Sequence, residues 1–344
     1  MSFAGNLQEV LKKLLISDED RAVYTKDAVE IQNFVIEELK KVDNTFREVF
    51  NGLSLGGSYL DRVKLNTPDE FDMHMKLKFP LNITPERDQS AFIFLNAPFI
   101  VASCGRIHRL KLQSWLRDAF HKVFNPVCSF TSSSRQTYKL SYTLEGYGCA
   151  HTIEAVGSSR SIKFDLVPAF EFTGAQWPLP VPPVTEKVRQ DWPWFAIPQT
   201  MPKRAKRTTT FMAIAPHWER EMMKKSDNMK NILRLMKGLR DAHAQKLPHL
   251  SSYMLKTVLL HQLEKVDWQR DLGTLLVEMW SRLVEHLQNG RLPYYLESEH
   301  NVLTRMNAEQ LKKCRAASLE LLNRLKLAKA SGSHLECSLL FNVK

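Results

Sequence analysis

The chain has 344 residues, 44% of them hydrophobic, so it is long enough for one large domain or two closely joined domains with a sizeable core. Its net charge of +11 favours a polyanionic partner such as nucleic acid, nucleotide or an anionic membrane. No apolar run of about 18 residues predicts a membrane span, and the first residues lack a signal-peptide pattern. Five scattered cysteines without CxxC spacing predict a reduced intracellular protein.

Hydrophobic periodicity changes along the first half of the chain. Apolar residues at helical spacing predict helix within 7–50, and a second helix is expected over 110–124. Between 71 and 79, apolar and polar residues alternate, which predicts a strand with one buried face. Further strands are expected over 137–144 and 161–167.

The second half has a different composition. The stretch 177–202 is rich in proline and tryptophan, which favours an ordered connection over a loose linker. After it, helices are predicted over 217–246, 251–266, 271–289 and 304–329. The sequence therefore predicts an α+β protein, with a mixed lobe over 1–200 and an all-helical lobe over 201–344.

Three acidic residues are candidates for a metal site. Glu70 and Asp72 are two residues apart on a predicted strand, so their side chains share one face. Asp165 lies on the polar side of a later, otherwise apolar strand. Phosphoryl transfer commonly uses two divalent ions about 3.5–4 Å apart, and two carboxylates hold such a pair less readily than three. Such a pair is also common on a solvated strand face, so the order of the motifs matters more than any one residue.

A glycine turn precedes the carboxylates. Gly56, Gly57 and Ser58 let backbone N–H groups and a hydroxyl approach phosphate oxygens. A Gly-Gly-Ser stretch is also common in flexible turns. Tyr59 follows it directly, and its bulk favours an ordered turn.

These motifs resemble cyclic GMP–AMP synthase and the animal receptors similar to it. The resemblance rests on Gly-Gly-Ser-Tyr at 56–59, Pro-Asp-Glu-Phe-Asp at 68–72, Phe-Asp-Leu-Val-Pro at 164–168, His-Trp-Glu-Arg-Glu at 217–221 and Ser-Ser-Tyr-Met-Leu-Lys-Thr at 251–257. It covers roughly residues 20 to 325. It implies a two-lobed nucleotidyltransferase with a mixed β-sheet catalytic lobe and an all-α C-terminal lobe.

The resemblance also implies roles for individual residues. Glu70, Asp72 and Asp165 would be catalytic and hold two Mg²⁺ or Mn²⁺ ions. Gly57 and Ser58 would hold the donor triphosphate. In the helical lobe, Lys237 and Ser252 would contact that triphosphate, Tyr253 would stack on a base and Lys256 would add positive charge.

The implied activity is the joining of ATP and GTP into a cyclic dinucleotide of the cGAMP type, activated by a double-stranded nucleic acid in innate immunity. Arg220, Lys230 and Arg234 fall where the family places phosphate-contacting side chains. Lys230, Arg234 and Lys237 share one helical face, and contacts of this kind bind nucleic acid largely without sequence preference.

Two departures refine these expectations. The segment 222–228 has no cysteine, whereas most vertebrate relatives carry a zinc loop there, so no zinc is expected and double-stranded RNA is favoured over DNA. Met212 stands where the family often has an arginine that reaches the bases, which puts base preference and product linkage in doubt.

Alternatives stay open at this point. The chain could be a catalytically silent family member that binds nucleotide or acts as a scaffold, or a nucleotidyltransferase with a linear product. The expected location is cytoplasmic. The activating duplex, the product linkage and an activator-induced dimer are not determined by the sequence.

Overall fold

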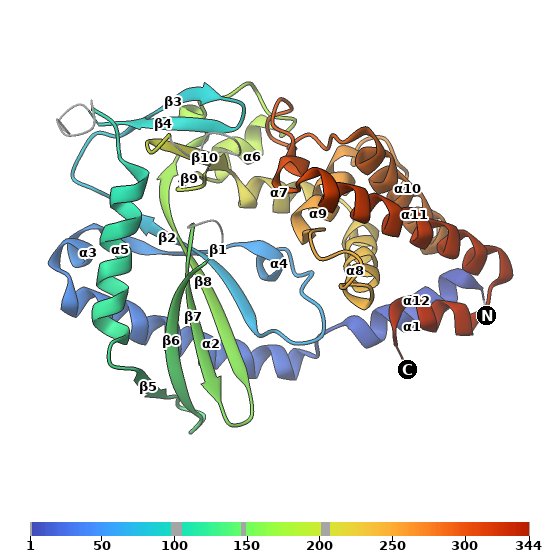
Figure 1. Ribbon diagram of the computed structural model, residues 1–344, viewed down its shortest axis with the longest axis horizontal. Helices are drawn as coiled ribbons and strands as arrows, with labels where there is room; N and C mark the ends of the chain where they lie inside the picture. The colour runs from blue at the N-terminus through green and yellow to red at the C-terminus, as the bar shows by residue number, and fades with distance from the viewer. Residues whose placement is uncertain (1, 98–104, 146–148, 201–206, 344) are drawn as a thin grey trace. The chain divides into compact units, whose positions relative to one another are not determined.

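The computed structural model describes residues 2–97, 105–145, 149–200 and 207–343 (Figure 1). Cys104 and the end of the proline-rich stretch, at 201–202, lie outside these residues. The chain forms two compact units. The sheet unit comprises Ser17–Leu60 and Thr67–Trp218, and the helical unit comprises Met1–Ile16, Asp61–Asn66 and Glu219–Lys344.

The sheet unit is built on a mixed sheet of ten strands, counted over the described residues. Eight of them follow the order β3-β4-β10-β9-β8-β7-β6-β5, while β2 pairs with β8 and β1 pairs with β2. The pairing of β2 with β8 is parallel, and the other described pairings are antiparallel. The strands are β1 (Phe50–Leu55), β2 (Glu70–Leu77), β3 (Thr84–Gln89), β4 (Phe92–Asn96), β5 (Cys128–Thr131), β6 (Thr137–Glu145), β7 (Ala150–Gly157), β8 (Ser161–Phe172), β9 (Trp194–Ile197) and β10 (Thr210–Ile214).

Helices cover one face of this sheet. The helix α2 (Asp18–Val42), drawn in blue in Figure 1, crosses β7 and β8, and its Val35 lies with Ile153 and Phe164 around a small apolar space. Its N-cap Ser17 accepts a hydrogen bond from the Asp20 amide at 3.0 Å, which satisfies an amide that the helix cannot. The remaining helices of this unit are α3 (Asn44–Val49), α4 (Gly57–Leu60), α5 (Arg109–Phe124) and α6 (Glu186–Asp191).

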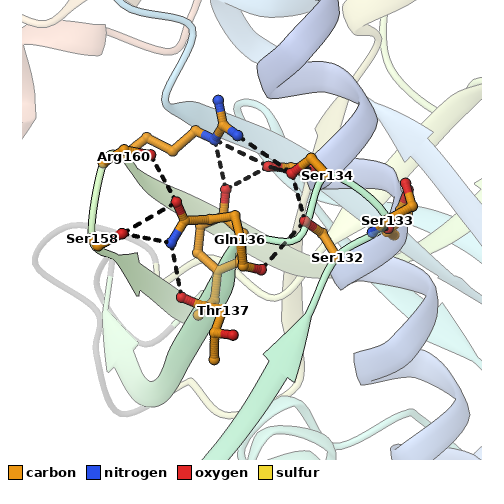
Figure 2. A network of polar contacts seen from close by, with 11 residues as sticks. Ser132, Ser133, Ser134, Gln136, Thr137, Ser158 and Arg160 are labelled. Carbon is orange, nitrogen blue, oxygen red and sulfur yellow. Dashed lines mark hydrogen bonds and ion pairs between the residues drawn. The ribbon is translucent and has the colours of Figure 1, made fainter.

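A polar network connects α2 to the turn between β5 and β6 and to the turn between β7 and β8 (Figure 2). The buried carboxylate of Asp27 on α2 accepts hydrogen bonds from Tyr138 at 2.6 Å, from the Arg160 Nε at 3.0 Å and from Ser134 at 2.9 Å. Figure 2 shows Arg160 and Ser134, from two different turns, converging in this network. A buried charge is stable only when it is paired and hydrogen-bonded, and here Arg160 supplies the opposite charge.

The helical unit is a bundle that begins with the first residues of the chain. The helix α1 (Phe3–Leu14) packs against α8, α10 and α12, and its Leu7 is fully buried. The cap Asp271 starts α10, and Gly290, in the left-handed region at φ +64°, ends it. The other helices are α8 (Asp227–Ala242), α9 (Ser252–His261), α10 (Leu272–Asn289), α11 (Ala308–Ser331) and α12 (His334–Phe341), while α7 (Pro216–Met223) contains the division between the two units.

The predicted fold class is confirmed: a unit of mixed helix and sheet accompanies an all-helical C-terminal part. The units differ from the expected lobes over 1–200 and 201–344, because α1 and the short segment 61–66 belong to the helical unit and the division falls at Trp218. None of the helices within the described ranges is long and apolar enough to cross a membrane.

Candidate active site

The strand β2 carries the first two candidate carboxylates. Its Phe71, Met73 and Met75 are buried, whereas Glu70 and Asp72 are half-buried and point away from them. The predicted alternation is confirmed at these positions. His74 differs, because only 8% of its surface is exposed and its ring stacks on Phe195 at 5.1 Å.

The third candidate lies beside the second. In the parallel pairing of β2 with β8, Asp72 is opposite Asp165 and Glu70 is opposite Lys163. The neighbouring pair Phe71 and Phe164 packs ring against ring at 5.7 Å on the other face of the sheet. The register therefore places Asp72 and Asp165 side by side, with Glu70 two residues along on the same face.

A residue that the sequence did not predict orients Asp165. The hydroxyl of the fully buried Thr152, on β7, donates a hydrogen bond of 2.6 Å to Asp165 Oδ1. The two residues are also opposite each other in the antiparallel pairing of β7 with β8. Only the strand register brings them together, so local sequence carried no signal for this contact.

The glycine turn lies directly against Asp72. The Gly56 amide donates to the Asp72 carbonyl at 2.8 Å. Gly57 has φ +56°, and a Cβ added there would lie 1.6 Å from Asp72 Oδ2. Only glycine fits this position, because any side chain would meet both the carboxylate and an unfavourable backbone conformation. The glycine turn and the Asp72 carboxylate are therefore in direct contact.

Side chains of β2 and α2 pack around the glycine turn. A Cβ at Gly56 would lie 2.7 Å from His74 Cε1. Burial lowers the pKa of His74 to about 4, so the ring is neutral at physiological pH. Tyr59 packs against Phe71 at 4.5 Å and shares a short hydrogen bond with Thr25 of α2. Ser58 is half-buried in the short helix α4. The ordered turn predicted from Tyr59 is confirmed.

A second group of candidates lies in the helical unit. Lys237 on α8 is 4% exposed and donates to the Val63 carbonyl at 2.7 Å. Its burial, and then the nearby charge of Arg240, lower its pKa to about 8. Ser252, at the start of α9, accepts a hydrogen bond of 2.8 Å from the Arg240 guanidinium.

Tyr253 and Lys256 are joined by acidic residues. The Tyr253 hydroxyl donates to Glu219 Oε1 at 2.6 Å, and the residue as a whole is half-buried. The Lys256 ammonium donates to Asp61 at 2.7 Å and lies 3.1 Å from Glu219 Oε2. Burial opposes the charge of Lys256, but the two carboxylates outweigh it and keep its pKa above the ordinary value.

The predicted basic face of α8 packs partly inward. Arg234 donates to the Arg62 carbonyl at 2.7 Å, on the same 61–66 segment that receives Lys237. Lys230, one turn earlier on α8, and Arg220 on α7 are both half-buried. Of the three residues predicted to share one face of α8, Arg234 and Lys237 donate hydrogen bonds to backbone carbonyls of their own unit.

The carboxylate set has the chemistry of a divalent-cation site. Carboxylate oxygens suit Mg²⁺ and Mn²⁺, and the register keeps Asp72 and Asp165 adjacent. Among the described side chains, no group of three or more His, Cys, Asp or Glu residues is arranged so that it could already hold a metal ion. The three residues therefore supply oxygen donors of the type that a hard cation prefers, and strand pairing aligns two of them.

Comparisons with known proteins identify the family of the chain. Residues 59–228 match the Mab-21 protein nucleotidyltransferase domain, and residues 228–319 match the Mab-21 protein HhH/H2TH-like domain. The chain is 62% identical over 344 residues to a cyclic GMP-AMP synthase-like protein of Drosophila melanogaster, covering 100% of this chain and 99% of that one. It is 33% identical to a cyclic GMP-AMP synthase-like receptor of Drosophila eugracilis, with 94% and 91% covered. It is 26% identical to one of Lucilia cuprina, with 88% and 87% covered.

Proposed function

We propose a function from the premise that this chain belongs to the family of cyclic GMP-AMP synthase-like proteins and receptors, which have a Mab-21 nucleotidyltransferase domain. Membership supports nucleotidyltransferase activity and a role as an innate immune sensor. The proposal is that a double-stranded nucleic acid, RNA rather than DNA, activates the protein to join ATP and GTP into a cyclic dinucleotide.

The observation that carries the proposal is the parallel register of β2 and β8. It sets Asp72 beside Asp165, with the glycine turn against Asp72. Carboxylate oxygens are the ligands that hard divalent cations prefer. Glu70, Asp72 and Asp165 would hold two Mg²⁺ or Mn²⁺ ions, which would supply charge neutralisation and activation of the attacking hydroxyl.

The remaining steps belong to residues of the chain. Backbone N–H groups at Gly57 and the Ser58 hydroxyl would bind the donor triphosphate, with Lys237 and Ser252 contributing from the helical unit. The half-buried ring of Tyr253 would stack on a purine. A hydroxyl of one nucleotide would attack the α-phosphate of the other and expel pyrophosphate. A second hydroxyl would then attack the remaining α-phosphate, expel a second pyrophosphate and close the ring.

Nucleic-acid activation is proposed from charge. The net charge of +11 suits a polyanion, and Arg220 and Lys230 are half-buried side chains on helices of the helical unit. The preference for RNA rests on the cysteine-free segment 222–228, which offers no thiolate for a zinc loop. A cytoplasmic location and an activator-induced dimer are part of the same proposal.

The test is a turnover assay with labelled ATP and GTP, Mg²⁺ or Mn²⁺, and a panel of RNA and DNA duplexes. A product that resists phosphatase identifies a ring, whereas a sensitive product identifies a linear nucleotidyltransferase. Asp72→Asn and Asp165→Asn should each abolish product and leave the fold intact. Asp118→Asn, an exposed carboxylate on α5, is the matched control and should leave turnover unchanged.

Two results of this assay would contradict the proposal in different ways. Nucleotide binding without product, across every duplex and both metals, would replace the proposal with a catalytically silent, nucleotide-binding member of the family. Equal rates with and without duplex would remove the activation step while keeping the enzyme.

A further inference from the structure

A series of buried polar contacts leads to Tyr253, the residue proposed to stack on a base. The Tyr253 hydroxyl donates to Glu219 Oε1 at 2.6 Å, and Glu219 Oε2 lies 3.1 Å from the Lys256 ammonium. Lys256 in turn donates to Asp61 at 2.7 Å. The three charged residues are at most 7% exposed, and all four residues belong to the helical unit.

These contacts fix what each group can still do. Lys256 faces two carboxylates, so its positive charge is already neutralised inside the unit. The residue Tyr253 is half-buried and its hydroxyl is committed to Glu219, which leaves the face of its ring as the part that can meet a ligand. Tyr294 packs beside that ring at 6.0 Å. A ring held at its hydroxyl end and along one side has little freedom to change rotamer.

We propose that Glu219 is a positioning residue that holds Tyr253 in the rotamer needed for stacking on a nucleotide base, and that Lys256 and Asp61 act through Glu219. The inference rests on the proposed function, because it concerns the same nucleotide-binding residue. It changes the role expected for Lys256, which helps to hold Tyr253 in place and does not contact the triphosphate.

The two roles of Lys256 make opposite predictions about phosphate number. A lysine at the triphosphate strengthens ATP binding far more than AMP binding, because AMP lacks the β- and γ-phosphates. A positioning network affects both equally, because both carry the same base. Base stacking on an aromatic ring is strong enough that its loss weakens binding about 5- to 150-fold.

The first experiment measures AMP and ATP affinity by calorimetry in Mg²⁺ for the full chain. Glu219→Leu removes the acceptor, and both affinities should fall by the same factor. Glu219→Gln keeps an oxygen that accepts the hydroxyl and should restore most of the binding. Lys246→Met, which breaks an exposed ion pair with Glu320, is the control and should change neither affinity. Should Glu219→Leu fail to fold, Tyr253→Phe removes the same hydrogen bond and should also weaken both ligands equally.

The second experiment needs no nucleotide. Crystals of the unliganded protein should show one rotamer at position 253 in the wild type and in Glu219→Gln, and several in Glu219→Leu or Tyr253→Phe. An unchanged single rotamer in these last two variants would overturn the positioning role, as would a selective loss of ATP affinity. A wild type that binds no nucleotide would overturn the proposed function, and the crystals would then decide the positioning role alone.

Discussion

The carboxylates of the two units have different neighbours. In the sheet unit, Asp72 and Asp165 are half-buried and the register places like charges side by side. In the helical unit, Asp61 and Glu219 are buried around the opposite charge of Lys256. Removing the lysine from a buried ion pair leaves uncompensated charge in the interior. The carboxylates of the helical unit are therefore committed to Lys256, whereas those of the sheet unit are aligned with each other by strand pairing.

The largest expected effect comes from breaking the buried ion pairs. Lys256→Met would leave Asp61 and Glu219 without their cation, which costs about 3–5 kcal/mol of unfolding free energy. Asp165→Asn should cost much less, because the amide oxygen can still accept the hydrogen bond from Thr152. Urea denaturation of the two variants measures both values, and equal losses would contradict the contrast between the units.

The glycine turn gives the next effect. Gly57→Ala meets both a positive φ and the Asp72 carboxylate, so we expect a loss of about 2–4 kcal/mol together with loss of turnover. Gly290→Ala has a similar φ of +64° but ordinary contact with Leu311 at 3.8 Å, and should lose only about 1–2 kcal/mol. Thermal unfolding measures the difference, and equal shifts would show that the contact with Asp72 is relaxed in solution.

The sheet unit should lose stability in acid through a buried histidine. His151 stacks on Phe120 at 4.8 Å and burial lowers its pKa to about 3. Between pH 6.5 and 3, the unfolded chain binds a proton that the folded protein does not, so stability falls as pH falls, by at most about 1.4 kcal/mol per pH unit. His151→Phe should reduce this slope in urea titrations at several pH values, and an unchanged slope would assign the effect to other groups.

The helical unit should respond at the alkaline end, with a smaller effect. The pKa of Lys237 is lowered from 10.5 to about 8, so the folded protein releases its proton first. Stability therefore rises with pH between about 8 and 10.5, by roughly 1–2 kcal/mol after allowance for relaxation. The difference in unfolding free energy between the wild type and Lys237→Met should follow this rise. A difference that does not change with pH would mean that Lys237 keeps its proton when folded.

Local patterns predicted several elements well. The alternation along β2 indicated both its buried face and the carboxylate face, and the α+β fold class followed from the change of period along the chain. Seven of the described strands were not predicted: β1, β3, β4, β5, β7, β9 and β10. The burial of His74 was not expected either, since a histidine in an alternating strand belongs by pattern to the polar face, and only the packing of Phe195 and Gly56 explains it.

The sequence by itself determined which residues are apolar at strand or helix spacing, because those periods follow from backbone geometry within one segment. Tertiary structure decided which segments are neighbours. It placed Asp165 opposite Asp72, brought Thr152 to Asp165, and assigned α1 and the 61–66 segment to the helical unit. It also turned Lys256 from a candidate phosphate ligand into the centre of a buried ion-pair network. The sequence gives the charge of a side chain, but the residue that neutralises this charge comes from a distant part of the chain.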